Sequence, residues 1–161
     1  MTFTIQSTTP LHDGRQSQAA LGIARGTRRL LVSLGYTSLT ELSLANGRRA
    51  DIVAQSDKGE IWIIEIKSSV VDFRTDNKWP EYQEFADRLL FAVAPDFPIE
   101  ILPATTGLIL ADAYGGDLAR PAPLQPLAPA RRKAMLQRIA RTACLRLQAL
   151  SDPDFMREWI E

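Results

Sequence analysis

The sequence contains only one cysteine and one histidine in 161 residues, and this scarcity excludes several kinds of site. A single cysteine cannot form an internal disulfide, which is typical of a reducing compartment, and we expect the cytoplasm. Cys144 falls in a helical pattern among apolar neighbours, so we expect a small buried side chain. His12 stands beside Pro10 and Gly14 in an unpatterned segment, which favours a loop residue over a metal ligand or a general base. A zinc site of spaced cysteines and histidines is therefore not expected.

Long hydrophobic runs are also missing. No segment approaches the roughly 20 apolar residues that a membrane-spanning helix requires, so we expect no membrane partner. The first residues lack the basic and apolar regions of a signal peptide, and the chain has no phosphate-binding glycine loop. With 45% hydrophobic and 24% charged residues, the composition is that of a soluble globular protein. We expect a loose arm over 1–14 and a single domain over 15–161, in which 128–161 form a C-terminal helical extension.

Net charge is zero, but the charges are segregated along the chain. Residues 14–40 and 118–151 carry basic side chains and no acid, whereas 41–117 carry fourteen acids against seven bases. This separation suits a central carboxylate site with a rim that attracts phosphates. The alternative is that the arginines only keep the outer faces of two helices in water, and the sequence leaves both options open. The candidates for phosphate contacts in these segments are Arg25, Arg28, Arg29, Arg131, Arg132 and Lys133.

A β-hairpin is predicted at the centre of the chain, with strands over 50–55 and 60–67. If a three-residue loop joins them, with Gly59 in the left-handed conformation, the register places Asp51 directly across from Glu65. Facing side chains on neighbouring strands have Cβ atoms about 5 Å apart, so two carboxylates there repel each other. A cation between them would offset the repulsion. The hairpin therefore predicts a metal site.

Lys67 lies two residues after Glu65, so both side chains point to the same face of the sheet. A Glu-x-Lys pair is also common on a solvated sheet face, where it only keeps an edge strand soluble. The strand is apolar on both faces before Glu65, however, which favours an interior strand. Together with the facing Asp51, the pattern favours a metal site with a lysine beside it.

Glu41 is a candidate third acid for this site. The Asn-Gly pair that begins at Asn46 is a strong turn signal between the first two of three predicted strands. A two-residue loop pairs Asp51 with Leu42 and sends Glu41 to the other face of the sheet. One extra bulged residue would instead bring Glu41 onto the metal face.

These residues resemble a known signature. Asp51, thirteen intervening residues and then Glu65-Ile66-Lys67 are similar to the motif of the PD-(D/E)XK nuclease superfamily, with Ala50 where the superfamily name has proline. A longer string resembles the MmcB-like family of DNA repair proteins. Its matching segments are 46–51, 64–69, 72–73, 78–80 and 87–88, and the similarity runs from about residue 15 to the C-terminal helix.

The resemblance implies a restriction-endonuclease-like α/β core, with helix, three strands, helix and strand in order, a mixed central sheet flanked by helices, and an added C-terminal helix. It implies metal-dependent hydrolysis of DNA, with Mg²⁺, or Mn²⁺ as a substitute, held by Asp51, Glu65 and the backbone carbonyl of Ile66. Lys67 would orient the nucleophile and stabilise charge on the reacting phosphate. Phosphate contacts carry no information on base sequence, so cleavage should follow DNA structure or damage rather than base sequence. Further candidates for them are Arg48, Arg49, Ser68 and Lys78.

Two other functions stay open at this point. The chain could be a DNA-binding repair factor that keeps the nuclease fold without the activity and acts through a repair-protein partner. It could also be a restriction-like or RNA-directed enzyme. All three signature positions keep the reactive residue types, which favours the enzyme. A homodimer would let two small domains address two strands, and it remains a further option.

Periodicity and turn residues predict the other elements. The first helix is expected to bury Leu21, Ala24, Leu31 and Leu34 and to pack closely at Gly22 and Gly26, and the last helix is expected to bury Leu147 and Leu150. The predicted order is a helix over 15–34 capped by Asp13, strands over 38–45, 49–55 and 60–68, a loop over 70–77, a helix over 80–93, strands over 100–102 and 106–112, an edge strand within 118–124, a helix over 130–150 and a terminal turn over 154–160.

Overall fold

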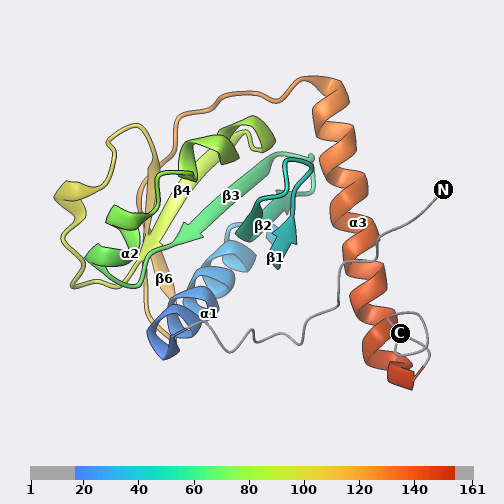
Figure 1. Cartoon of the computed structure of the whole chain (residues 1–161), viewed down its shortest axis with the longest axis horizontal. Helices are drawn as coiled ribbons and strands as arrows, with labels where there is room; N and C mark the ends of the chain where they lie inside the picture. Colours follow the sequence, from blue (N-terminus) through green and yellow to red (C-terminus); the bar gives the residue numbers. More distant parts are fainter. Residues whose placement is uncertain (1–16, 155–161) are drawn as a thin grey trace.

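A six-stranded mixed sheet forms the centre of the structure, a computed structural model that describes residues 17–154 (Figure 1). The strands lie side by side in chain order. β2 is antiparallel to both of its neighbours, β1 and β3, whereas β3, β4 and β5 are parallel and β6 is antiparallel to β5. Their bounds are β1 Tyr36–Ser43, β2 Arg49–Ser56, β3 Ile61–Ile66, β4 Arg88–Val93, β5 Gly107–Ala111 and β6 Gly116–Arg120.

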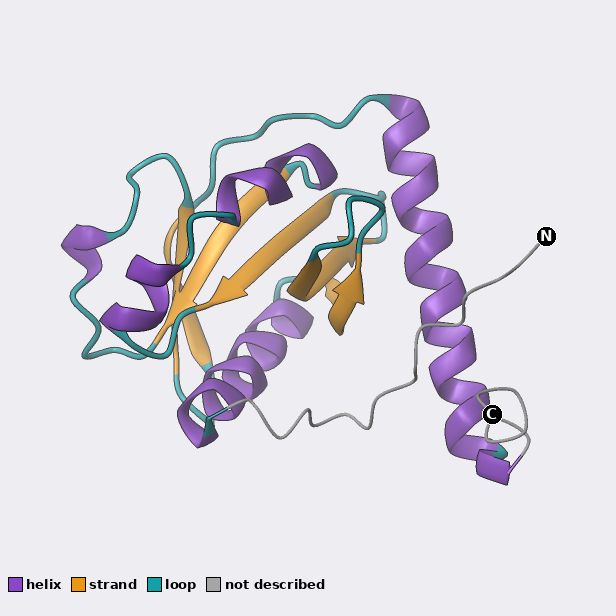
Figure 2. Ribbon diagram, in the orientation of Figure 1, coloured by secondary structure: helices purple, strands orange, loops and turns teal. Residues whose placement is uncertain are grey.

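Helices cover both faces of this sheet (Figure 2). The α-helices are α1 (Gln18–Ser33), α2 (Val70–Thr75) and α3 (Pro129–Ser151), and two short 3₁₀ helices are η1 (Trp79–Phe85) and η2 (Ile99–Ile101). α1 lies on one face, and α2 and η1 lie on the other, while α3 packs against β1 and η1. The predicted fold class, a mixed sheet flanked by helices with an added C-terminal helix, is confirmed. None of the helices within residues 17–154 combines the length and apolar character needed to cross a membrane.

α1 packs on its face of the sheet through Ile23 and Leu31, which are buried against residues of the inner strands such as Ile52 and Ile64. The predicted apolar stripe is correct at Leu31. It is wrong at Leu34, which is 42% exposed. Leu34 stands one residue beyond the last helical residue and forms the C-cap, so it no longer faces the sheet.

The start of α1 differs from the prediction. The helix begins at Gln18, and the hydroxyl of Ser17 accepts a hydrogen bond from the N–H of Ala20 at 3.1 Å. Ser17 is therefore the N-cap instead of Asp13. The sequence offered both residue types within five positions, and composition alone does not separate two good caps that close together.

Gly26 lies where α1 approaches the loop between β5 and β6. A Cβ atom there would stand 1.9 Å from the carbonyl oxygen of Asp112 and 2.4 Å from that of Gly115, so no larger residue fits. The close packing predicted for Gly26 is confirmed, although the contact is with this loop instead of the sheet. At Gly22 a Cβ would meet Ala113 at an ordinary 3.6 Å.

The opposite face of the sheet is covered by shorter pieces. Tyr82 and Phe85 of η1 are buried together with Met135 and Ile139 of α3. The ring of Phe73 in α2 meets Phe91 of β4 edge to face, with centroids 5.5 Å apart. This is the face to which Ile63 of β3 points, and therefore also the face of Glu65 and Lys67, since alternate residues of a strand share a face.

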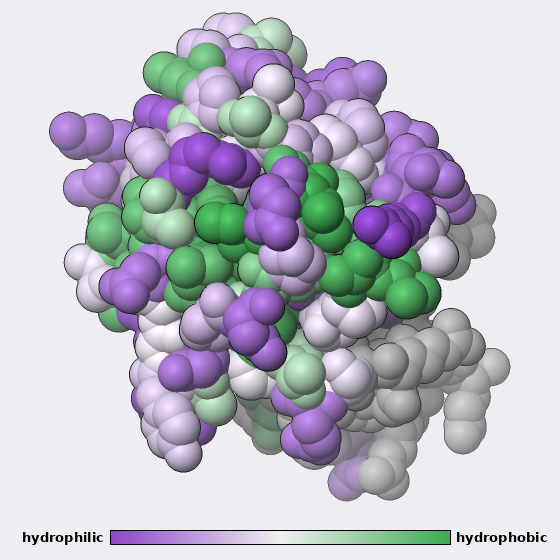
Figure 3. Space-filling model, turned by 90° about the vertical axis from the view of Figure 1, so that its left-hand side faces the viewer, coloured by the Kyte–Doolittle hydropathy of each residue, from purple (hydrophilic) through white to green (hydrophobic). Residues whose placement is uncertain are grey.

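Seen from the side on which α2 lies, the surface carries a band of hydrophobic residues between polar ones (Figure 3). Val71 of α2 and Ile99 of η2 are 70% and 42% exposed. Apolar side chains therefore remain exposed on these two short helices.

The β2–β3 hairpin has the predicted register. Ile52 pairs with Ile64, and Gln55 pairs with Ile61. Gly59 has a φ of +82°, and the N–H of Ser56 donates to the carbonyl of Glu60 at 3.0 Å. The three-residue loop is confirmed, and the register places Asp51 across from Glu65.

The β1–β2 hairpin differs from the two-residue loop that the Asn-Gly pair predicts. Leu42 pairs with Ala50, and the N–H of Leu44 donates to the carbonyl of Arg48, so the loop has three residues, 45–47. Glu41 lies between the pairs Thr40–Ile52 and Leu42–Ala50 and has a φ of +52°, which breaks the regular strand geometry there. The predicted pairing of Asp51 with Leu42 is wrong.

The predicted helix over 80–93 is also wrong. Residues 79–85 form η1, and residues 88–93 form β4, a buried strand between β3 and β5. A continuous apolar run is the pattern of a strand buried on both faces of a parallel sheet, and it also fits a buried helix. Two smaller predictions fail nearby, because 70–75 form α2 where a loop was expected and 99–101 form η2 where a strand was expected. β5 matches the strand predicted over 106–112 closely, whereas β6 begins and ends earlier than the predicted edge strand and overlaps it only at 118–120.

α3 has the predicted position, but its buried side is shorter than predicted. Met135 and Ile139 are buried, whereas Leu147 and Leu150 are 69% and 71% exposed. Cys144 is exposed as well, so the expected buried thiol is a wrong prediction. In the second half of the helix, Arg146 donates to the carbonyls of Thr40 and Glu41 in β1, while Leu147 and Leu150 do not reach the core. The N-terminal arm over 1–14, with His12, and nearly all of the terminal turn over 154–160 lie outside the described residues.

Candidate metal and phosphate site

Backbone hydrogen bonds hold the side chains of Asp51 and Glu65 in place across the β2–β3 hairpin. Glu65 accepts a hydrogen bond from the backbone N–H of Asp51 through Oε1 at 3.1 Å. Asp51 in turn accepts from the backbone N–H of Ile66 through Oδ2 at 2.8 Å. Glu65 is 4% exposed, and Asp51 is partly exposed. The two carboxylates therefore have fixed positions on the face predicted for the metal.

The surroundings of the pair disfavour two negative charges. Burial raises the pKa of Glu65 well above its usual range, and the neighbouring Asp51 carboxylate raises it further. Burial also raises the pKa of Asp51, although the Ile66 N–H and the Lys67 ammonium act in the opposite direction. Two neighbouring carboxylates ionise together at low cost only beside a cation. Without a metal, the pair is expected to retain a proton.

Lys67 is buried beside this pair, but its charge is directed elsewhere. Its Nζ lies 2.5 Å from Oδ2 of Asp76, which follows α2. Burial lowers the pKa of Lys67, but the hydrogen bond and charge of Asp76 outweigh this effect and raise it. The ammonium group is therefore charged at neutral pH and has a fixed partner.

A cavity of about 460 Å³ opens next to these groups. The hydroxyl of Tyr82 donates to the carbonyl of Arg49 at 3.0 Å, and burial together with Glu65 and Asp51 raises the pKa of Tyr82, so this donor stays protonated. Asp51 and Glu65 themselves do not line this cavity. Its walls are Gly47, Arg48, Arg49, Lys67, Asp72, Thr75, Asp76, Lys78 and Tyr82.

The donor set fits a hard divalent cation that keeps several waters. Mg²⁺ is commonly bound by one or two carboxylates, with water and substrate phosphates completing its shell. Asp51 and Glu65 supply two carboxylates whose charges have no cationic partner in contact among residues 17–154. Within the same residues, no group of three or more acidic, histidine or cysteine side chains is placed to hold an ion. Glu41 therefore does not form a three-acid cluster with the pair, and its Oε1 lies 3.7 Å from Arg49.

Comparison with known proteins identifies the family of this chain. The family model of MmcB-like DNA repair proteins matches residues 7–154, which is nearly the whole chain. The chain belongs to the MmcB-like family of DNA repair proteins. A solved structure, the SPO1766 protein of unknown function from Silicibacter pomeroyi, is 48% identical, with a TM-score of 0.83 over 86% of this chain and 95% of that one. No curated protein matches the chain.

Three of the predicted phosphate-binding residues of this MmcB-like chain lie at the cavity. They are Arg48, Arg49 and Lys78. Arg48 pairs with Glu81 in a fork geometry, with distances of 2.8 and 3.1 Å, at the exposed rim. Ser68 lies close by, where its N–H donates to Asp72 at 3.1 Å. The structure therefore gathers cations and carboxylates of the central segment in one place.

The predicted phosphate-binding residues of α1 lie elsewhere. The helix covers the face of the sheet opposite to Glu65 and Lys67. Arg28 donates to the hydroxyl of Ser38 at 3.1 Å, and Arg29 donates to the carbonyl of Tyr114 at 2.9 Å. Arg25 is exposed on the same helix. Arg28 and Arg29 thus hold α1 to its neighbours, and the structure brings none of the three arginines to the cavity.

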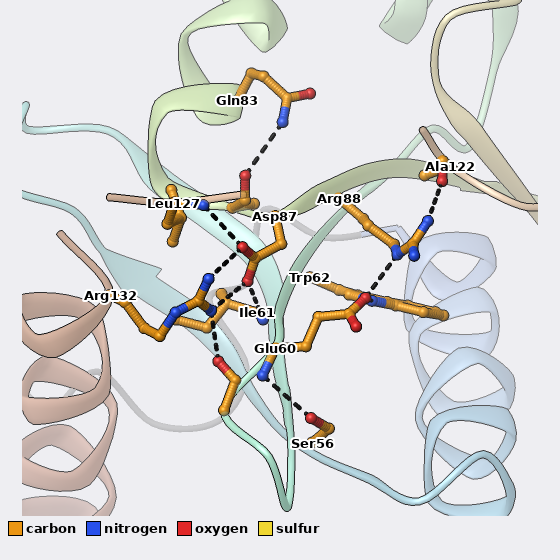
Figure 4. Close-up of polar contacts among 12 residues, drawn as sticks. Ser56, Glu60, Ile61, Trp62, Gln83, Asp87, Arg88, Ala122, Leu127 and Arg132 are labelled. Atoms are coloured by element: carbon orange, nitrogen blue, oxygen red, sulfur yellow. Dashed lines mark hydrogen bonds and ion pairs between the residues drawn. The ribbon is translucent and has the colours of Figure 1, made fainter. Parts of the chain in front are cut away.

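The predicted cations of α3 lie at the other end of β3. Arg132 forms two hydrogen bonds, of 2.6 and 2.7 Å, with the carboxylate of Asp87 and a third with the carbonyl of Gly59 (Figure 4). Arg131 stacks over the ring of Phe85 at 4.9 Å, and Lys133 is exposed. Arg132 thus completes a buried structural cluster far along the strand from Glu65.

The sequence did not identify Asp76 and Tyr82 as site residues. The sequence places Asp76 in a predicted loop and Tyr82 in a predicted helix, and it gives neither residue a role in the site. Asp76 stands nine residues after Lys67, and only the unpredicted turn of α2 brings it back to the strand. No local spacing rule indicates such a contact.

Proposed function

We propose that this MmcB-like protein hydrolyses DNA phosphodiester bonds with the help of Mg²⁺, for which Mn²⁺ can substitute. The observation that carries the proposal is the largely buried pair Asp51 and Glu65, whose carboxylates repel each other and have no cation in contact among residues 17–154. The resemblance of Asp51, Glu65 and Lys67 to the PD-(D/E)XK signature supports the same conclusion. Such a pair is costly to fold unless a cation joins it.

Each residue has a role in this mechanism. Asp51, Glu65 and the backbone carbonyl of Ile66 would hold the metal. A bound Mg²⁺ polarises the phosphate and lowers the pKa of a water molecule. The ammonium group of Lys67 orients the attacking water and stabilises the negative charge that develops on the phosphate oxygens.

The rim of the cavity would bind the DNA backbone. Arg48, Arg49 and Lys78 present cations at its wall, and phosphate contacts of this kind hold a substrate in register without reading its bases. We therefore propose a preference for DNA structure or damage over base sequence. Binding through such cations weakens as salt concentration rises.

The test combines metal binding with cleavage. Mg²⁺ and Mn²⁺ are titrated by calorimetry into wild type, Glu65→Gln and the exposed control Glu84→Gln, each with and without DNA. Branched, single-stranded and duplex DNA and an RNA of the same sequence are then offered as substrates. We expect wild type and Glu84→Gln to bind metal and cleave DNA, and Glu65→Gln to lose metal binding and at least about a hundredfold of the rate. Equal cleavage by Glu65→Gln and wild type would refute the proposal.

A second function is favoured by one specific observation. Asp51 and Glu65 accept backbone hydrogen bonds, and Lys67 forms an ion pair with Asp76, so all three residues have structural partners without a metal. A DNA-binding repair factor that acts through a partner protein would also keep these contacts. In that case wild type and Glu65→Gln would bind branched DNA with equal affinity, and neither would bind metal or cleave DNA. Sedimentation of the free protein and of its DNA complex would show whether a homodimer forms.

A further inference from the structure

We propose that Asp76 is a positioning residue that fixes the ammonium group of Lys67 at the wall of the cavity. The inference rests on the proposed nuclease function, in which Lys67 acts on the reacting phosphate. Within residues 17–154, Lys67 forms its ion pair with Asp76 rather than with Asp51 or Glu65. The side chain of Lys67 is 5% exposed and that of Asp76 is 21% exposed, so the pair is largely removed from water.

The carboxylate of Asp76 is itself held in place. Its Oδ1 accepts the backbone N–H of Lys78 at 2.9 Å, while its Oδ2 accepts Lys67. The N–H of Asp76 donates to the carbonyl of Phe73 at 3.2 Å and ends α2. Both oxygens and the backbone are thus engaged, and Asp76 has little freedom to follow a moving lysine.

α2 connects this carboxylate to the sheet. The hydroxyl of Ser69 caps the helix by accepting the N–H of Asp72, and Asp72 accepts the N–H of Ser68 at 3.1 Å. Phe73 anchors the helix on the ring of Phe91. Ser68 directly follows Lys67, so the segment leaves β3, turns through α2 and returns to contact the residue where it began.

The consequence for Lys67 is a fixed ammonium position. A lysine side chain has four rotatable carbon bonds, and its charge is otherwise free to sample many places. Catalysis by a point charge depends on its position relative to the developing charge, and small misplacements cost about a hundredfold in rate. Asp76 therefore adds to the rate by holding Lys67 in position and not by binding the phosphate, because its carboxylate has the same sign of charge as the phosphate.

The first test is kinetic and uses a double-mutant cycle. The kcat and KM for branched DNA with Mg²⁺ are measured for Asp76→Asn, Asp76→Glu, Lys67→Ala, Asp76→Asn with Lys67→Ala, and the exposed control Asp96→Asn. We expect Asp76→Asn to lower kcat about ten- to a hundredfold with KM and metal affinity within about twofold of wild type. Asp76→Glu should recover part of the rate, and Asp76→Asn should cost nothing further once Lys67 is alanine. Additive losses in the double variant, or a loss confined to KM, would overturn the proposal.

The second test does not depend on activity. Nitrogen-15 NMR of the lysine side chains detects ammonium groups that are ordered and protected from exchange with water. We expect a Lys67 signal in wild type and Asp96→Asn that disappears in Asp76→Asn, while the backbone spectrum outside 67–79 is unchanged. A Lys67 signal that persists in Asp76→Asn would overturn the proposal. If wild type cleaves no DNA, the nuclease function fails, and the NMR result still decides whether Asp76 fixes Lys67.

Discussion

The two ends of β3 carry two buried carboxylate clusters that are completed in opposite ways. At the first residue of the strand, the N–H of Ile61 donates to Asp87 at 2.8 Å, and at the last residue the N–H of Ile66 donates to Asp51 at 2.8 Å. Asp87 also receives the Arg132 guanidinium and the N–H of Leu127 (Figure 4). Asp51 has Glu65 as its neighbour instead, a second acid.

The electrostatics of the two clusters differ accordingly. Burial raises the pKa of Asp87, but hydrogen bonds from Arg132, Ile61 and Leu127 outweigh burial and lower it. For Glu65, burial and the adjacent carboxylate act in the same direction, and both raise its pKa. A buried acid that already has its cation serves the fold. A largely buried pair that has no cation in contact among residues 17–154 marks a position where a ligand can supply the missing charge.

The largest expected effect is the loss of stability when the carboxylate of Asp87 is removed. In Asp87→Ala, Arg132 and two backbone N–H groups lose their acceptor, and removing one member of a buried ion pair costs about 3–5 kcal/mol. Because the Arg132 side chain is 28% exposed, we expect about 2–4 kcal/mol, measured by urea unfolding. The exposed control Asp96→Ala should change stability by less than about 0.5 kcal/mol. Equal values for the two variants would remove the structural role of Asp87.

A smaller effect, of opposite sign, is expected from adding metal at the other end. Mg²⁺ binds the folded carboxylate pair, so at pH 7 and a concentration about a hundred times its Kd it should stabilise wild type by about 2.7 kcal/mol. Glu65→Gln should gain none of this, whereas Asp87→Asn should gain all of it from a lower starting stability. The thermal midpoint with Mg²⁺ or with chelator measures both. Stabilisation of Glu65→Gln by Mg²⁺ would place the ion elsewhere.

The hairpin at the centre of this comparison could be predicted because its turn fixes its register. Gly59 allows the three-residue loop, and strand alternation then brings Asp51 and Glu65 together. β4 could not be distinguished from a helix in the same way. Its residues from Leu89 to Val93 are all buried, so the strand shows no alternation of polar and apolar positions.

The candidate site was predictable where its residues are close across one turn. Asp76 reaches Lys67 through α2, a segment whose sequence predicts a loop, and Arg132 reaches Asp87 from 45 residues away in sequence. Neither contact has a local pattern. Charge segregation along the chain also does not say which face of the sheet a helix covers, and Arg28 and Arg29 therefore lie opposite to the cavity.

The smallest expected effect is the pH dependence of stability, and it should have opposite signs at the two ends of β3. Because burial and Asp51 raise the pKa of Glu65, the folded protein without metal binds more protons than the unfolded chain between the usual pKa and the raised one. The free energy of unfolding therefore falls as pH rises through that window, by at most about 1.4 kcal/mol per pH unit for one proton. In chelator, Glu65→Gln should match wild type below about pH 4 and become the more stable protein as pH increases.

Asp87 has a lowered pKa, so its contribution to stability is present above the usual pKa and lost as pH falls through the lowered one. Asp87→Asn should therefore lack an acid limb that wild type and Glu65→Gln both show in urea unfolding at successive pH values. Parallel curves of unfolding free energy against pH for wild type and Glu65→Gln in chelator would mean that the Asp51–Glu65 pair imposes no electrostatic cost that a bound metal could offset.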